Sequence, residues 1–128
     1  MSEIDRESPE VLGFLQLCAD RRFHRAVMAA FEAETGLPPD GYWIEATAGG
    51  APAFETMSAT ASFAFDKGAA IVGWAAHGDA CGGFPGLSND EVEATLEATA
   101  RTRAGEVPGA EHWMLFATGA GVRVTKLG

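Results

Sequence analysis

The sequence predicts an α/β fold with a mostly parallel sheet, helices on both faces and an antiparallel hairpin at the C-terminal end. Apolar segments that fit buried strands alternate with segments whose apolar residues recur at helical spacing. Such alternation is typical of parallel sheets covered by helices. Two strand-like segments, over 111–118 and 122–127, flank a glycine-rich turn and predict the closing hairpin.

Length and composition favour one domain. The chain has 128 residues, and 47% of them are hydrophobic, which is enough for a buried core. The first ten residues are acidic and contain no apolar run. We therefore expect a flexible N-terminal arm over 1–10 and a single α/β domain over 11–128.

The first half of the chain predicts two strand–helix units. An apolar run over 11–17 fits a buried strand, and apolar residues spaced three and four apart over 22–35 fit a helix that ends at Gly36. A second strand is expected over 42–47 and leads into a tight Ala-Gly-Gly turn. An alanine-rich helix is then expected over 54–67.

The second half begins with a third strand, expected over 69–75, and a glycine-rich loop follows it. Ser88 fits a helix N-cap, and Glu91 three residues later completes a capping box. The helix that starts there is expected to reach about residue 103, because Gly105 is a helix breaker.

The charge of the chain argues against two classes of partner. There are 9 Lys and Arg against 18 Asp and Glu, for a net charge of −9, which disfavours nucleic acid and anionic membrane surfaces. No apolar run reaches the ~20 residues of a membrane-spanning helix, and the N-terminus lacks a signal-peptide core. We expect a cytoplasmic protein whose two cysteines stay reduced, although a Cys18–Cys81 bridge stays open in an oxidised sample.

Two cysteines and a histidine lie at the ends of predicted strands. Cys18 follows the first strand, and His77 and Cys81 follow the third. Ligands of α/β sheets bind beyond the carboxyl ends of the strands, so these side chains are expected to converge. Two thiolates and an imidazole form a three-ligand zinc set that leaves a fourth position for water, which is the arrangement of catalytic rather than structural zinc.

Asp20 and Arg22 lie beside the first expected ligand. Two thiolates cancel the charge of Zn²⁺, so a bound water loses its proton less readily and needs help from surrounding groups. Asp20 is placed to accept a hydrogen bond from that water, and Arg22 to pair with Asp20 and lower its pKa. This arrangement favours a zinc-bound hydroxide, a nucleophile for a small electrophilic carbon. The sequence leaves open whether Asp20 itself ligates the metal.

The same residues resemble the motifs of a known family. Cys18, Asp20 and Arg22 resemble the Cys-x-Asp-x-Arg motif of the β-class carbonic anhydrases. His77 and Cys81, followed by two glycines, resemble the His-x-x-Cys-Gly motif of that family. The Ala-Gly-Gly turn after the second strand resembles the Ala-Gly turn of the family.

The resemblance implies the β-carbonic-anhydrase fold, Zn²⁺ on Cys18, His77 and Cys81, and an Asp20–Arg22 dyad that orients the zinc water. It also implies reversible hydration of CO₂ to bicarbonate, and a homodimer with its active sites near the subunit interface. Related zinc enzymes of that fold hydrolyse carbon disulfide or carbonyl sulfide, so the substrate class is a small electrophile.

Three departures favour an alternative function. Three residues separate His77 and Cys81 where the family has two, the chain is short for the family, and Glu45 places an acid before the Ala-Gly turn. The alternative is a zinc-binding protein of the same fold that lacks hydratase activity and serves as a binding or interaction module. A lesser alternative is an α/β module without metal.

Overall fold

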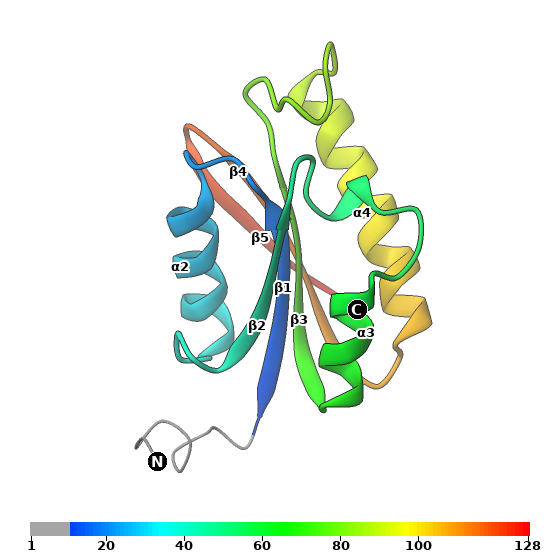
Figure 1. Ribbon diagram of the computed structural model, residues 1–128. Helices are drawn as coiled ribbons and strands as arrows, with labels where there is room; N and C mark the ends of the chain where they lie inside the picture. Colours follow the sequence, from blue (N-terminus) through cyan, green and yellow to red (C-terminus); the bar gives the residue numbers. More distant parts are fainter. Residues whose placement is uncertain (1–10) are drawn as a thin grey trace.

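A computed structural model describes residues 11–128 (Figure 1). The N-terminal arm expected over 1–10 lies outside the described residues. Five strands form one sheet in the order β2-β1-β3-β4-β5. The elements in chain order are β1 (Leu12–Cys18), α2 (His24–Thr35), β2 (Tyr42–Thr47), the 3₁₀ turn η1 (Ala51–Ala53), α3 (Ala59–Asp66), β3 (Ala69–His77), α4 (Asn89–Glu106), β4 (Glu111–Thr118) and β5 (Gly121–Leu127).

The sheet is parallel except at one edge, which confirms the predicted fold class. β1 pairs in parallel with both β2 and β3, and β3 pairs in parallel with β4. β5 alone runs antiparallel, as the second strand of the closing hairpin. The carboxyl ends of β1 and β3 therefore lie next to each other at one end of the sheet.

Helices cover both faces of the sheet (Figure 1). On one face, Val27 and Phe31 of α2 pack against Leu15, Ala75 and Leu115 of the strands. On the other face, α3 and α4 contribute a second cluster around Phe14 and Trp74; its helical members are Ala61, Ala64, Val92, Leu96 and Ala100. Phe14 and Leu15 are neighbours on β1 and point to opposite faces, as the period of two in a strand requires.

Two predicted helices differ from the structure. The helix expected over 54–67 is α3 alone, because Phe54 adopts an extended backbone with φ −103° and ψ 124° after the 3₁₀ turn. Helix formation restarts at Ser58, whose hydroxyl accepts from the N–H of Ala61 at 3.0 Å. Alanine content alone overestimated the length of this helix.

The third helix runs past Gly105, which was expected to end it. Arg103 stabilises this last turn, because its guanidinium donates to Glu106 at 2.6 Å and to the carbonyl of Phe54 at 3.1 Å. These bonds to a charged group offset the ~1 kcal/mol that a helical glycine costs. At the other end of α4, the capping box predicted for Ser88 and Glu91 is confirmed.

None of the helices within residues 11–128 is both long and apolar enough to cross a membrane.

Candidate metal centre

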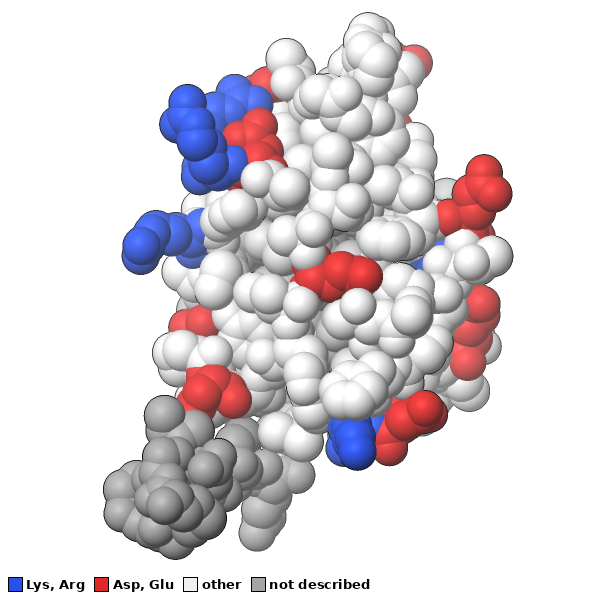
Figure 2. Space-filling model, viewed as in Figure 1, with Lys and Arg blue, Asp and Glu red and all other residues white. Residues whose placement is uncertain are grey.

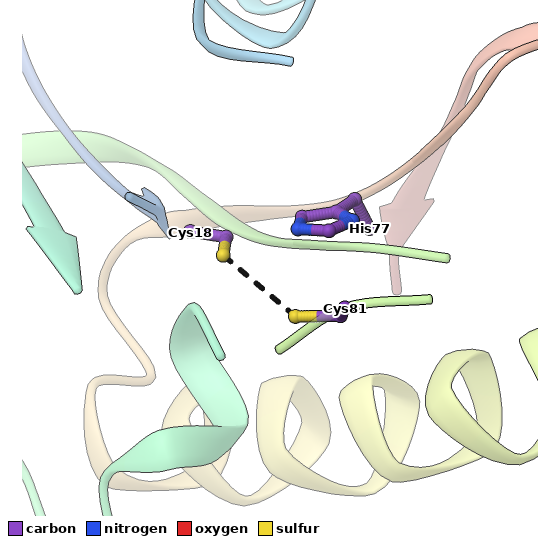
Figure 3. Close-up of side chains that lie close together, drawn as sticks. All are labelled: Cys18, His77 and Cys81. Atoms are coloured by element: carbon purple, nitrogen blue, oxygen red, sulfur yellow. Dashed lines mark hydrogen bonds between the residues drawn. The ribbon is translucent and has the colours of Figure 1, made fainter. Parts of the chain in front are cut away.

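The structure brings Cys18, His77 and Cys81 together, as predicted (Figure 3). One ligand atom from each residue lies within 4.8 Å of the other two, and the sulfur atoms of the cysteines are 3.8 Å apart. All three side chains are buried, with 8%, 1% and 4% of Cys18, His77 and Cys81 exposed. β1 ends at the first residue and β3 at the second, so the parallel pairing of these strands creates two thirds of the site.

The His77 ring is oriented with Nε2 toward the site. Its Nδ1 lies 2.6 Å from the carbonyl of Gly78, which can only accept, so Nδ1 carries a proton and Nε2 is the ring nitrogen available to a metal. Phe23 stacks on the ring with 4.5 Å between the centroids. Nε2 is buried and makes no hydrogen bond. A buried imidazole nitrogen without a hydrogen bond, beside two sulfur atoms, fits the donor set of a zinc site.

The glycine turn after β2 supports Cys18. The N–H of Gly49 donates to the sulfur of Cys18 at 3.4 Å. Gly50 adopts φ 68°, and a Cβ there would lie 2.3 Å from the carbonyl oxygen of Ala75. Only glycine therefore allows this turn to pack against β3 and to bring a backbone N–H to the sulfur.

Burial raises the pKa of the Cys81 thiol, and the backbone N–H groups of Gly83 and Gly49 act in the opposite direction. The thiol therefore stays protonated to a higher pH when no cation is present. Zinc binding requires the thiolate, so it releases a proton and becomes tighter as the pH rises.

Asp20 and Arg22 form the predicted pair. Nε of Arg22 donates to both carboxylate oxygens of Asp20 at 3.1 Å, and Nη2 donates to Oδ2 at 2.8 Å. The backbone N–H of Arg22 adds a bond to Oδ1 at 2.9 Å. The Arg22 side chain, followed by its backbone N–H, holds the pKa of the Asp20 carboxyl well below its usual range. Asp20 is thus a fixed, charged acceptor, and it is not a member of the three-residue cluster.

The loop between His77 and Cys81 accommodates its third intervening residue through two left-handed residues. Asp79 has φ 55° and Ala80 has φ 64°. The carboxylate of Asp79 accepts from Asn89 Nδ2 at 3.0 Å and from the N–H of Gly119 at 2.6 Å. Neither Asn89 nor Gly119 was singled out from the sequence, since their relation to this loop depends on the tertiary fold.

Glu45, the acid before the Ala-Gly turn, forms hydrogen bonds within the fold. Its Oε1 accepts from Gln16 at 2.6 Å and from the Ser58 hydroxyl at 2.7 Å, which ties β2 to β1 and to the start of α3. Basic side chains instead gather beside the site: Figure 2 shows blue atoms near the end of the molecule where α2 begins. Arg21, Arg22 and Arg25 are exposed in that segment. Asp20, which pairs with Arg22, offsets part of this positive charge.

Comparison with models of protein families finds no match, and neither does comparison with curated protein sequences. A search of solved structures finds a β-carbonic anhydrase, CafD, of the filamentous fungus Aspergillus fumigatus. The similarity covers 96% of this chain and 92% of the fungal chain, with a TM-score of 0.50 and 13% sequence identity. The two proteins share a fold. At this identity the likeness concerns the fold alone.

Proposed function

We propose that the protein is a zinc-dependent lyase of the carbonic anhydrase type, which reversibly hydrates CO₂. One observation carries the proposal: the unpartnered Nε2 of His77 faces two sulfur atoms at the end of a parallel sheet, next to a carboxylate held by arginine. The donor set and the adjacent Asp–Arg pair are what this chemistry needs. The likeness of the fold to a β-carbonic anhydrase supports the same proposal.

In this proposal Cys18, His77 and Cys81 hold the zinc ion. When bound, the ion acts as a Lewis acid that makes water a nucleophile near neutral pH. Asp20 accepts a hydrogen bond from the attacking water and so directs its lone pair toward the carbon of the substrate. Arg22 occupies both oxygens of Asp20, which keeps the carboxylate charged and opposes its movement onto the metal.

CO₂ is the substrate that the proposal favours, and another small electrophile such as carbonyl sulfide is the alternative. The proposal includes a cytoplasmic location and a homodimer, both of which follow from the sequence and its resemblance. Light scattering coupled to size exclusion measures the mass in solution, and the mass of a single chain would remove the dimer from the proposal.

The test combines metal analysis with stopped-flow hydration of CO₂. We expect one zinc ion per chain and a rate well above the uncatalysed one. Asp20→Asn should keep the metal and lower the rate by about a hundredfold, because the directing acceptor is weakened. Stoichiometric zinc with an uncatalysed rate would instead support the metal-binding module without hydratase activity, and absence of zinc binding would contradict both.

A further inference from the structure

We propose that Asp79 is a positioning residue that fixes the loop carrying Cys81 and, through its backbone, the arginine of the Asp20–Arg22 pair. The inference deepens the proposed function and rests on the same metal centre. It concerns a residue whose side chain is directed away from the cluster and toward two distant elements.

Every polar group of Asp79 has a partner. Its N–H donates to Asn89 Oδ1 at 2.7 Å, and its Oδ1 accepts from Asn89 Nδ2 at 3.0 Å. Its Oδ2 accepts from the N–H of Gly119 at 2.6 Å. Its carbonyl accepts from Arg22 Nη2 at 3.4 Å. Asp79 thus joins the loop between His77 and Cys81 to the first residue of α4, to the β4–β5 turn and to Arg22.

These bonds hold a backbone conformation that the loop would not adopt alone. Asp79 and Ala80 are the two residues within 11–128 that combine a side chain with a positive φ. Such conformations carry an energetic cost for L-residues and persist where surrounding contacts enforce them. Asp79 lies midway between His77 and Cys81 in the sequence. Loss of its hydrogen bonds would therefore let the distance between these two expected ligands vary.

A carboxylate suits this position because both of its partners are donors. Ionised aspartate offers two acceptor oxygens and no donor. In Asp79→Asn one oxygen becomes an NH₂ group, which must face either Asn89 Nδ2 or the Gly119 N–H. One of the two bonds is then lost, whereas Asp79→Ala loses both. Asp79→Ala should therefore have a larger effect than Asp79→Asn.

The first readout is metal affinity and geometry. We expect Asp79→Ala to weaken zinc binding about ten- to a hundredfold, as loss of groups that orient ligands does, with Asp79→Asn between it and the wild type. In the cobalt-substituted protein the visible d–d bands should shift, because they report the ligand geometry. Asp90→Asn is the control, since Asp90 is an exposed acid one residue beyond Asn89 and its change removes the same charge.

The second readout needs no metal. In a glutathione redox buffer, oxidised glutathione takes two electrons from the Cys18 and Cys81 thiols, forming one protein disulfide and two reduced glutathione molecules. The equilibrium gives the effective concentration of one thiol at the other. We expect this effective concentration to fall at least tenfold in Asp79→Ala. Asn89→Ala should have the same effect because it removes the partner of Asp79 on α4, and Asp90→Asn should leave the value unchanged.

Variants that keep the wild-type helical content, zinc affinity, cobalt spectrum and thiol equilibrium would overturn the role of Asp79. Absence of metal binding by the wild-type protein would instead overturn the proposed function, and the thiol equilibrium alone would then decide about Asp79. If Asp79→Ala fails to fold, Asp79→Asn and Asn89→Ala carry the same comparison.

Discussion

Oδ2 of Asp20 lies 3.4 Å from Nε2 of His77. These atoms come from different strand ends, and each faces the region between the carboxyl ends of β1 and β3. Nδ1 of His77 donates to the carbonyl of Gly78, so Nε2 is the nitrogen that lies close to this carboxylate oxygen. A proton on Nε2 would form an ion pair with Asp20, and a metal ion with its water would provide positive charge at the same place.

The Asp20–Arg22 pair leads to a prediction about pH. The ordinary pKa of an aspartate is 3.8, and the contacts of Arg22 lower that of Asp20. A lowered pKa means that the stabilisation by this pair is complete above about pH 4 and is lost as the pH falls through the pKa of the folded state. Carbon-13 NMR of the metal-free protein should show the Asp20 carboxyl still ionised at pH 3.8.

Arg22→Gln provides the comparison for this titration. Without the guanidinium, the pKa of Asp20 should rise toward its ordinary value, and the carboxyl should be about half protonated near pH 4. A wild-type carboxyl that is already half protonated there would contradict the expected role of Arg22.

Zinc should stabilise the folded protein through His77. A ligand present at a hundred times its dissociation constant adds about 2.7 kcal/mol to the free energy of unfolding. Thermal unfolding with and without zinc should show this increase in the wild type and lose most of it in His77→Ala. His24→Ala should retain the full increase, because His24 lies on α2 and outside the cluster. An equal zinc effect in both variants would remove His77 from the ligand set.

Zinc should slow the formation of a disulfide between the two cysteines. Their sulfur atoms are 3.8 Å apart, and a disulfide requires about 2.05 Å, so a small movement suffices. Treatment of the metal-free protein with oxidised glutathione should lower the mass of the chain by two hydrogens. The oxidised chain should then take up no alkyl group under denaturing conditions. One equivalent of zinc should slow this reaction at least tenfold, because the thiolates are then coordinated. Oxidation at the same rate with zinc would argue against binding through both sulfurs.

The part of the site on strand ends was predictable from the sequence, and the part on loops was not. Apolar runs that stop at Cys18 and near His77 predict neighbouring strands, and parallel pairing then brings their ends together. The position of Cys81 depends on left-handed backbone at Asp79 and Ala80, residues whose side chains give no signal for it. The bonds that hold that loop come from Asn89 and Gly119, which are distant in the sequence.

The helices show the same difference between features set by local sequence and features set by tertiary contacts. The capping box at Ser88 is a local interaction and was predicted from two residues three positions apart. The persistence of α4 past Gly105 depends on a contact between Arg103 and the carbonyl of Phe54, a residue before α3. Local propensity indicated neither this contact nor the extended backbone at Phe54 that shortens the preceding helix.

A side chain at Gly50, in the turn beside Cys18, would meet both backbone strain and a steric clash. Gly36 has φ 78° and ψ 3°, the left-handed conformation, where alanine adds about 1–2 kcal/mol of backbone strain. Gly50 has φ 68° and ψ −148°, a region that essentially only glycine adopts, where a side chain costs about 1–3 kcal/mol. A Cβ at Gly36 meets nothing within 4 Å, whereas one at Gly50 would lie 2.3 Å from the carbonyl oxygen of Ala75 and 3.2 Å from the backbone nitrogen of Cys18. Gly50→Ala should therefore lower the free energy of unfolding by about 2 kcal/mol more than Gly36→Ala, because it combines overpacking with the more restricted backbone of Gly50. It should also weaken zinc binding, since the turn must move away from Cys18. Urea unfolding of the two metal-free variants measures the difference in stability, and equal losses would show that the turn can shift without strain and that its close approach to β3 is not required.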